Sequence, residues 1–503
     1  MTSLWLDRAG LLTPDSLVPG AHYDAVVVGA GITGLSSGLL LARSGMRVAI
    51  LEARTMGAGT TGHTTAKLSL LQGTVLSALR RQYPQKVVTA YVDANREGQA
   101  WLLRLLEDRS VPFQRRDAYT FSVSDSGADR VAAEHTAARE SGLDVELAED
   151  TELPFTTQRT IRLRQQAQFH PMDVLDALAA DFRVHGGVLV EGVRVRNVSR
   201  GRSPVVETDA GAVHASLVVL ATGMPILDRG LYFAKLKASQ SYAVALRQPE
   251  SAVIPAGMYL SAESPGRSLR SYPAADGELL LVGGNGHQVG REPSPQRRLN
   301  ELLDWARFYF PGAKATHTWS GEDYQATNLM PFVGKLPRGR GRIFFATGYN
   351  KWGMSNGIAA SLAISAEILG GRMHWADTIH RRVTSPAGAA ATIIHNVEVA
   401  TTLVESWTKA ELGSAEPATP TQPAEGEGTV VRRGRTPVAV STVDGVTCRR
   451  SAVCTHLGGL LSWNDAEQSW DCPLHGSRFS ANGEVLQGPA TRDLTGAENP
   501  VAE

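Results

Sequence analysis

Apolar residues gather in short, nearly continuous runs that end at glycine turns. Residues 24–29 (DAVVVG) and 46–51 (MRVAIL) flank a helix-like segment at 35–45, and residues 215–223 and 343–348 repeat the pattern farther along the chain. Runs of this kind are typical of parallel strands that helices cover on both faces. They predict an α/β domain assembled from separate parts of the chain.

Two other stretches, 239–246 (SQSYAVAL) and 277–282 (GELLLV), read as half-exposed antiparallel strands and predict a second, mixed β-sheet. The glycine-rich residues 283–290 follow the second of these strands. Pro293 and Pro295 stand where a phosphate-binding helix would begin. We therefore expect a turn at 283–290 and no second nucleotide site.

The pattern of apolar residues changes after residue 376. Residues 389–409 have helical character, residues 414–428 are rich in proline and poor in apolar side chains, and residues 436–441 (TPVAVS) resume a strand pattern. The middle stretch has the composition of a flexible linker. The sequence therefore predicts a helix and linker at 376–428, followed by a small all-β domain at 429–503.

Composition narrows the classes of function. The chain has 503 residues, 50 basic and 50 acidic side chains and three cysteines. Without a basic excess to follow a phosphate backbone, we expect no nucleic-acid partner. No stretch approaches eighteen uninterrupted apolar residues, so we expect no membrane span and a cytoplasmic location. Cys448 stands apart from the other two cysteines, which fits a reducing compartment.

The first strand pair carries a dinucleotide-binding fingerprint, GAGITG at 29–34, with Glu52 at the end of the second strand. Gly29 permits the tight turn, Gly31 lets the backbone approach a pyrophosphate, and Gly34 lets helix and strand pack closely. Glu52 can hold ribose hydroxyls. The fingerprint alone does not separate FAD from NAD.

The loop at 57–67 (GAGTTGHTTAK) favours FAD, because its backbone donors and hydroxyls suit a second approach to the pyrophosphate and the isoalloxazine ring. An NAD domain has no evident use for such a loop. The turn at 348–355 (GYNKWGMS) opens another helix-like segment. The start of that helix could aim N–H donors at the edge of the flavin.

Two mixed clips of cysteine and histidine lie near the end of the chain. Cys454 and His456 form the first clip, and Cys472 and His475 form the second after an interval of fifteen residues. A zinc finger groups its cysteines in one clip and its histidines in the other. Mixed clips supply two thiolates and two imidazoles, the ligand set of a Rieske [2Fe–2S] cluster. These four residues are the predicted metal ligands.

The fingerprint, the TTGHTTAK loop, the strand that includes Val195, the ATG turn at 221–223 and the GYNKWGMS turn resemble the D-amino-acid-oxidase-like FAD oxidoreductases. With the terminal cluster, the chain is similar to the bacterial subfamily that fuses such a flavoprotein to a Rieske domain. The resemblance implies the fold class α/β + β: a Rossmann-like FAD-binding domain with an inserted mixed β-sheet substrate domain, then a small all-β Rieske domain.

The resemblance also places the domains and the cofactor contacts. The FAD-binding domain is expected at 1–100, 160–235 and 325–375, and the substrate domain at 100–160 and 236–324. The expected FAD contacts are Gly29, Ala30, Gly31, Ile32, Thr33, Gly34, Glu52, Ala53, Arg54, Thr60, Thr61, Gly62, His63, Thr64, Thr65, Ala66, Lys67, Val195, Thr222, Gly223, Gly348, Asn350, Lys351, Trp352, Gly353, Met354 and Ser355.

The segment 454–489 resembles a Rieske domain throughout, with two departures. Respiratory Rieske proteins join two further cysteines in a disulfide, and Gly459 and Leu474 stand at those places. By resemblance, the Ser477 hydroxyl bonds a cluster sulfide, while Phe479 replaces a tyrosine that donates a second bond in high-potential members. With fewer donors, we expect a middling reduction potential.

Three residues are candidates for a direct part in the chemistry. His63 lies in the loop expected beside the flavin, where some relatives attach FAD covalently, although a hydrogen bond within the loop explains it as well. Lys351 could stabilise reduced flavin or assist the reaction with oxygen. Arg270 could grip a substrate carboxylate through two parallel bonds.

The resemblance implies that a small amine or amino acid is oxidised at its C–N bond, and that electrons pass singly from the flavin to the cluster and on to an unknown acceptor. Three alternatives stay open. The chain could be an electron-transfer protein that supplies a partner enzyme, or a redox sensor without turnover. A Rieske oxygenase would need a mononuclear iron triad, and His374, Asp377 and His380 are better explained as exposed residues of a helix end.

Overall fold

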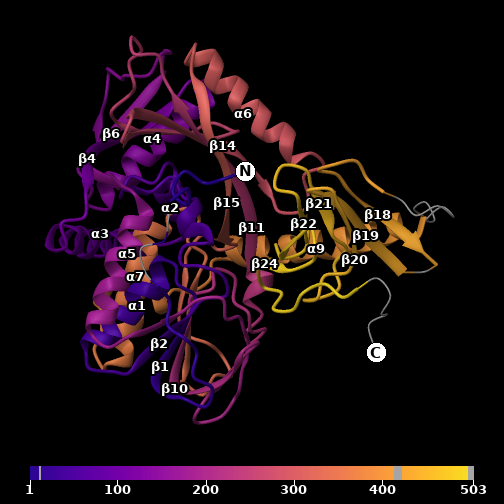
Figure 1. The fold of residues 1–503 in the computed structure, drawn as a ribbon. Coiled ribbons are helices and arrows are strands. Elements are labelled where there is room, and N and C mark those ends of the chain that lie inside the picture. Colours follow the sequence, from indigo (N-terminus) through magenta and orange to yellow (C-terminus); the bar gives the residue numbers. More distant parts are fainter. Residues whose placement is uncertain (9, 11–12, 413–421, 435, 497–503) are drawn as a thin grey trace.

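Two large sheets with their helices form most of the molecule, and a small β-rich module lies at one side of them (Figure 1). The computed structural model describes the chain except for residues 9, 11–12, 413–421, 435 and 497–503. The predicted fold class is confirmed by this arrangement. The two sheets are built from interleaved parts of the sequence, as expected for a domain assembled from separate parts of the chain.

The first sheet carries the glycine fingerprint. Its strand order is β16-β17-β10-β1-β2-β7, with β9 and then β8 added beside β10. The five strands from β17 to β7 are parallel, and β2 and β17 are buried along their whole length, as expected for a sheet covered on both faces. The strands are β1 (His22–Val28), β2 (Val48–Leu51), β7 (Val188–Val190), β8 (Val195–Val198), β9 (Val205–Thr208), β10 (Gly211–Leu220), β16 (Phe332–Lys335) and β17 (Ile343–Thr347).

Helix α1 (Ile32–Arg43) follows the fingerprint and packs against α5 (Pro171–Val184) and α7 (Gly353–Ile368). The long α3 (Gln85–Asp108) lies against α7. Glycines let these elements come close: a Cβ on Gly38 of α1 would lie 2.6 Å from the Ile50 side chain of β2, and a Cβ on Gly357 of α7 would lie 2.7 Å from Thr33 Oγ1 of α1. The helices therefore hold the turn after β1 against the turn before α7.

The second sheet has the order β15-β11-β14-β13-β12-β4-β6-β3, with β5 beside β6. It is antiparallel except where β4 runs parallel to β12. Its strands are β3 (Lys67–Leu68), β4 (Phe113–Ser122), β5 (Glu146–Leu147), β6 (Arg159–Phe169), β11 (Leu236–Arg247), β12 (Met258–Ser261), β13 (Arg267–Ala274), β14 (Gly277–Gln288) and β15 (Lys314–Ala326). Its helices are α2 (Val75–Gln82), α4 (Asp125–Glu140) and α6 (Pro295–Tyr309).

Two details differ from the expectations. β6 belongs to the second sheet, so the chain returns to the first sheet only after α5, not near residue 160. The turn expected at 283–290 is wrong, because β14 continues to Gln288 between β11 and β13. The glycines serve close packing: a Cβ on Gly284 would lie 2.6 Å from the Gly266 carbonyl oxygen. Pro295 begins α6, where its missing N–H costs no bond.

The C-terminal module consists of two small antiparallel sheets, β18-β19-β20 and β21-β22-β23-β24. Its buried core contains both cysteines of the mixed clips. The strands are β18 (Gly428–Arg433), β19 (Thr436–Val443), β20 (Val446–Ser451), β21 (Ser462–Asn464), β22 (Ser469–Asp471), β23 (Arg478–Ser480) and β24 (Val485–Gln487). The sheet β21-β22-β23-β24 and its loops face the two large sheets (Figure 1).

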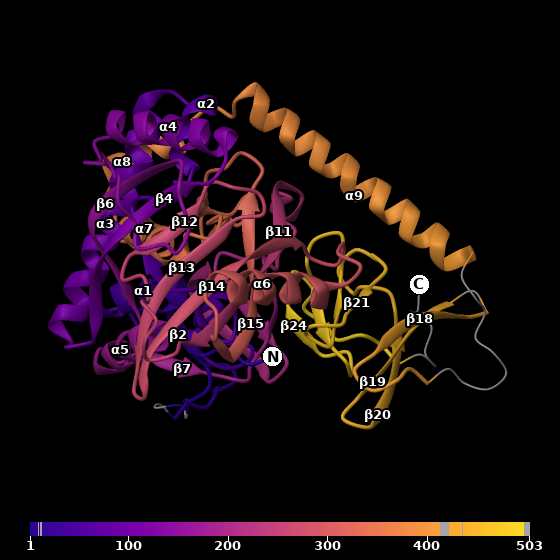
Figure 2. The same ribbon diagram turned by 90° about the horizontal axis from the view of Figure 1, so that it is seen from above.

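The short α8 (His374–His380) leads to α9 (Pro386–Leu412), which runs along one side of the molecule to the C-terminal module (Figure 2). Part of the expected linker, residues 413–421, lies outside the described residues. His395 on α9 bonds the Leu236 carbonyl through Nε2 at 3.0 Å, and the Trp407 indole donates to the Gly458 carbonyl at 3.1 Å.

Among the described helices, α9 alone is long and apolar enough to cross a membrane by length and composition, over residues 386–408. Only 11% of that window is buried. The bonds of His395 and Trp407 tie the helix to the protein at two places. The absence of a membrane span therefore stays a prediction.

Candidate cofactor sites

The glycine fingerprint turns tightly between β1 and α1. Gly29 has φ +105°, and a Cβ there would lie 2.6 Å from the Ala221 carbonyl oxygen. A Cβ on Gly34 would lie 1.8 Å from the Gly29 carbonyl oxygen, so backbone packing excludes any larger residue. Around Gly31, the only atom that a Cβ would approach is Thr61 Oγ1, at 3.1 Å. Because Gly31 has no side chain, its backbone is accessible from the side of Thr61, in the loop at 57–67 that is expected to contact FAD.

Glu52 follows β2 and is fixed to the fingerprint. Its carboxylate accepts from the backbone N–H of Ala30 at 2.8 Å and of Arg54 at 3.0 Å. Burial lowers the pKa of Arg194 below its usual range, and the attraction of Glu52 partly offsets this. This end of the pocket therefore presents a carboxylate suited to ribose hydroxyls, with an arginine beside it.

The turn between β17 and α7 uses unusual backbone conformations. Gly348, Asn350 and Lys351 have positive φ angles of +80°, +48° and +69°. The Lys351 ammonium donates to Ser241 Oγ at 2.7 Å, and its backbone N–H donates to the Asp323 carboxylate. Surrounding protein lowers the pKa of Lys351 although the side chain keeps access to solvent. The turn thus brings the Lys351 ammonium close to the N-terminus of α7, whose N–H groups could also bind an anion.

One pocket joins these features. Of the expected FAD contacts, it is lined by Gly29, Gly31, Ile32, Thr33, Glu52, Ala53, Arg54, Thr60, Thr61, Thr64, Val195, Thr222, Gly223, Gly348, Lys351, Gly353 and Met354. The others, Ala30, Gly34, Gly62, His63, Thr65, Ala66, Lys67, Asn350, Trp352 and Ser355, do not line it. Glycine turns, threonine hydroxyls and the start of a helix meet here, which is the donor set that a dinucleotide pyrophosphate requires. These residues fit FAD.

Two of the three candidates for catalysis, His63 and Arg270, do not line this pocket. His63 ends the 3₁₀ turn η1 (Thr60–His63), where its Nδ1 bonds the Gly59 carbonyl at 2.8 Å and burial lowers its pKa. Arg270 is fully buried on β13. Its guanidinium donates to the carbonyls of Ala66 (2.9 Å) and Phe169 (3.3 Å).

The guanidinium of Arg270 also lies 5.2 Å from the centre of the Trp5 ring. Desolvation lowers the pKa of Arg270 to about 9. Because both its bonding partners are backbone carbonyls, the described contacts of Arg270 are structural. Lys351 is the one candidate that the pocket includes.

The four predicted metal ligands come together at the tips of two loops of the C-terminal module. Cys472 hydrogen-bonds to Cys454 and thereby lowers the pKa of Cys454 to about 6. The rings of His456 and His475 are 5.3 Å apart, centre to centre, at 84°. Burial lowers the pKa of His475 to about 3, and its buried Nδ1 has no partner. A neutral imidazole with a free nitrogen is the form that ligates iron.

The arrangement fits a two-iron cluster better than a single ion. Among the described residues, no three His, Cys, Asp or Glu side chains converge closely enough to hold one metal ion. In a Rieske centre each iron takes only two protein ligands, with both thiolates on one iron and both imidazoles on the other. The paired thiols and the paired imidazoles match this division.

The surroundings of the ligands also match the Rieske resemblance. A Cβ on Gly459 would lie 2.7 Å from Leu474 Cδ1, so these two positions face each other where a respiratory disulfide would stand. All three cysteines of the chain are free. The fully buried Ser477 hydrogen-bonds to Cys454 and accepts from the Ala490 N–H at 3.0 Å. Phe479, also fully buried, offers no hydroxyl.

The two cluster histidines are covered by residues that lie between β10 and β11. His456 Nε2 bonds the Asp228 carboxylate at 3.0 Å, and its side chain is 8% exposed. Phe233, in the 3₁₀ turn η2 (Tyr232–Lys235), packs edge-on against both imidazoles, with ring centres 5.1 Å from His456 and 4.8 Å from His475. In this structure the two histidines therefore contact another part of the same chain.

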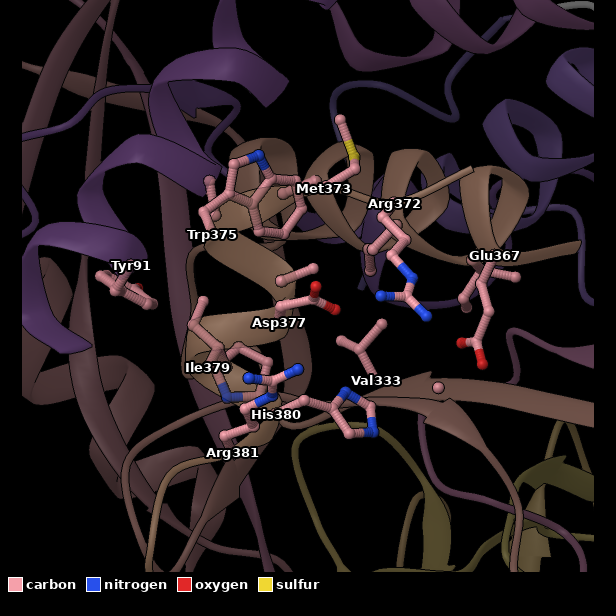
Figure 3. A pocket seen from close by; sticks show the side chains of 18 of the residues that line it. Tyr91, Val333, Glu367, Arg372, Met373, Trp375, Asp377, Ile379, His380 and Arg381 are labelled. Carbon is pink, nitrogen blue, oxygen red and sulfur yellow. The ribbon is translucent and has the colours of Figure 1, made fainter. Parts of the chain in front are cut away.

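A roomier cavity of about 560 Å³ lies elsewhere, between α7, α8 and β16 (Figure 3). Arg372, Glu367, Asp377 and His380 place polar groups around it (Figure 3). Glu367 is already paired with Lys335 at 2.8 Å. The cavity includes none of the glycine fingerprint, so size alone would have pointed away from the cofactor site.

Comparison with known proteins agrees with both cofactor sites. The family model described as FAD dependent oxidoreductase matches residues 24–366, and the model described as Rieske [2Fe-2S] domain matches residues 418–498. The chain therefore belongs to the FAD dependent oxidoreductase family and carries a C-terminal Rieske domain. Its cofactors are FAD and a Rieske [2Fe–2S] cluster.

Individual relatives reflect the same division. YhfW of Bacillus subtilis (strain 168), named for a Rieske 2Fe-2S centre, is 28% identical over 97% of this chain and 96% of its own. The cytochrome b6-f complex iron-sulfur subunit of a Synechococcus strain is 54% identical over 44 residues, 9% of this chain and 26% of its own.

Solved structures share the flavoprotein fold. Glycine oxidase from Geobacillus kaustophilus has a TM-score of 0.61 at 20% identity, covering 72% of this chain and 100% of its own. L-amino acid deaminase from Proteus vulgaris has a TM-score of 0.60 at 15% identity, covering 74% and 100%. At these identities the likeness establishes the fold and leaves the substrate open.

Proposed function

We propose that this oxidoreductase oxidises the C–N bond of a small amine or amino acid, and that its Rieske domain receives the electrons singly and passes them to a separate acceptor. The observation that carries the proposal is the covering of both cluster histidines by Asp228 and Phe233 of the flavoprotein. When bound, FAD accepts two electrons as a hydride equivalent, whereas a [2Fe–2S] cluster carries one.

A single strand connects the two sites. Tyr324 on β15 lines the FAD pocket, and Glu322, two positions earlier on the same strand, lies at the cluster loop. A Cβ on Gly476, the residue after the ligand His475, would lie 2.8 Å from the Glu322 carboxylate and 2.3 Å from Ala238 Cβ. This backbone approach, which only glycine permits, supports a docked arrangement built for the pair of cofactors.

We assign the role of the base that deprotonates the substrate to Lys351, and not to Arg270 or His63. Lys351 lines the FAD pocket, and its amine donates to Ser241 and has a lowered pKa. An amine with a lowered pKa can take the proton from a substrate ammonium, which must be neutral before its C–H bond can be oxidised. Asp323, which accepts from the Lys351 backbone N–H, positions the turn.

The solved structures that share the fold, which include glycine oxidase and L-amino acid deaminase, support a small amino-acid substrate. The charge balance and the lack of a basic excess support the expectation that nucleic acid is not a partner. Two buried cysteines kept free as cluster ligands support a cytoplasmic location.

The test is anaerobic addition of small amines and amino acids to the oxidised holoprotein while both chromophores are followed. We expect a substrate to bleach the flavin and then reduce the cluster. Phe233→Leu should slow reduction of the cluster without slowing flavin bleaching. Phe308→Leu, which changes an exposed ring on α6, is the matched control and should leave both rates unchanged.

A different outcome would select an alternative. If no amine or amino acid bleaches the flavin but a reduced carrier protein reduces both centres, the chain is an electron-transfer protein. If a substrate bleaches the flavin while the cluster stays oxidised, and Cys454→Ser leaves turnover with the acceptor unchanged, the Rieske domain is not on the electron path. If Lys351→Met leaves the pH dependence of flavin reduction unchanged, Lys351 is not the base.

A further inference from the structure

The FAD pocket has a wall that the flavoprotein does not supply. Leu486, Gln487, Gly488, Ala490 and Thr491 line it together with residues of the fingerprint. All five belong to the Rieske domain, 120 or more positions beyond residue 366, where the match to the FAD dependent oxidoreductase family ends. We call residues 485–491, which comprise β24 and the turn after it, the closing segment.

Two arginines of the flavoprotein hold the closing segment at its ends. Arg194 Nη2 donates to the Val485 carbonyl at 2.7 Å, and Arg196 Nη1 donates to the Thr491 carbonyl at 3.0 Å. Arg194 also lines the pocket beside Glu52, whereas Arg196 does not line it. Because both acceptors are backbone carbonyls, the arginines fix the path of the segment whatever its side chains are.

Inside the Rieske domain the closing segment is tied to the cluster loop. The Ala490 N–H donates to Ser477 Oγ at 3.0 Å, and Ser477 hydrogen-bonds to the ligand Cys454. At the other end of the segment, the Val485 N–H donates to the Asp493 carboxylate at 2.8 Å. The wall of one cofactor site is thus continuous, through one serine, with a ligand of the other.

We propose that the closing segment is part of the FAD site and that it retains the nucleotide half of FAD, at the end of the pocket marked by Glu52 and Arg194. The Rieske domain then has a second function besides electron transfer, because FAD can leave only when this domain moves off the flavoprotein. The docked domain covers the pocket with Leu486 and Thr491 and excludes water from the bound dinucleotide. This inference rests on the FAD site and not on the identity of the substrate.

The test measures release of FAD from the full-length holoprotein without any substrate. After dilution, the rise of free-flavin fluorescence gives the dissociation rate. Leu486→Ala removes the apolar contact, and Arg196→Ala frees the Thr491 carbonyl without touching the pocket. We expect each variant to release FAD at least about fivefold faster, since a loosened wall chiefly raises the rate of dissociation.

Arg492→Ala is the matched control, because Arg492 is exposed, follows Thr491 directly and does not line the pocket. It should release FAD at the wild-type rate. The visible circular dichroism of the cluster is recorded for every variant, so that loss of the Rieske fold is distinguished from loss of the wall. If Leu486→Ala and Arg196→Ala keep an intact cluster and both release FAD at the wild-type rate, the proposal is wrong, whatever the substrate proves to be.

Discussion

Arg478 holds together a buried group of charges between the cluster loop and the flavoprotein, and its removal gives a sharp prediction. The guanidinium donates through Nε to Asp471 at 3.0 Å and through Nη2 to Glu467 at 3.3 Å and Ser469 at 3.0 Å. The side chains of Arg478 and Asp471 are 8% and 2% exposed. The carboxylates raise the pKa of Arg478 against the effect of burial, so it is charged at every working pH.

Arg478→Met keeps much of the apolar stem but leaves the Asp471 carboxylate buried without its counter-ion. Breaking a buried pair in this way costs about 3–5 kcal/mol of the free energy of unfolding. We expect the free energy of unfolding of Arg478→Lys to lie between those of wild type and Arg478→Met. An ammonium restores the charge but cannot bond several partners at fixed angles.

The assay is urea unfolding of the holoprotein followed by the circular dichroism of the cluster at wavelengths longer than those that oxidised flavin absorbs, where the signal reports the Rieske domain. Arg492→Met, at an exposed position of the same domain, is the control and should stay within about 0.5 kcal/mol of wild type. The double variant Arg478→Met, Asp471→Asn should recover part of the loss, because no uncompensated charge remains. A loss below about 1 kcal/mol for Arg478→Met would refute the account of a buried, essential counter-ion.

Three further predictions concern FAD, the cluster and pH. Gly34→Ala should yield protein without bound flavin, seen as loss of flavin absorbance, because its Cβ would lie 1.8 Å from a backbone oxygen. Mild thiol reductant should leave the cluster spectrum unchanged, since Gly459 and Leu474 replace the disulfide; a thiol-sensitive spectrum would contradict this. Burial raises the pKa of Glu134 from 4.5 to about 7, so the free energy of unfolding should fall by up to about 3 kcal/mol as pH rises from 4.5 to 7. Glu134→Gln should remove most of this slope in thermal unfolding, and an unchanged slope would refute the assignment.

The parts of the cofactor sites that were predicted from sequence are those encoded by neighbours along the chain. A glycine turn between two apolar runs fixes its own geometry, and Gly29 and Gly34 lie as their spacing indicates. The two mixed clips are equally local. Each sits on a loop closed by a backbone hydrogen bond, from Gly458 to Cys454 and from Gly476 to Cys472, both at 3.1 Å. Such features need no knowledge of distant segments.

What the sequence did not reveal depends on contacts between distant parts of the chain. His456 and Asp228 are 228 positions apart, and the closing segment meets Arg194 and Arg196 across nearly 300. Nothing in the local pattern of residues 485–491 indicates a nucleotide wall. Arg270 shows the same limit: alternation along β13 gives two faces but not what covers each one, and the N-terminal Trp5 covers the face with the guanidinium.

The docked position of the Rieske domain is encoded in surfaces and not in the length of its linker. A Cβ on Gly290 would lie 2.7 Å from the Pro473 nitrogen, and a Cβ on Gly476 would lie 2.3 Å from Ala238, so the two backbones approach where side chains are absent. Arg291 Nε donates to the Pro473 carbonyl at 3.0 Å in the same region. These contacts lie within the second clip, at Pro473, and directly after it, at Gly476, so they hold the ligand His475 from both sides. A tethered domain with so specific a docking surface needs little intrinsic affinity for the rest of the protein, because the tether keeps its effective concentration high. It can therefore remain free to leave, as delivery of electrons to a separate acceptor would require.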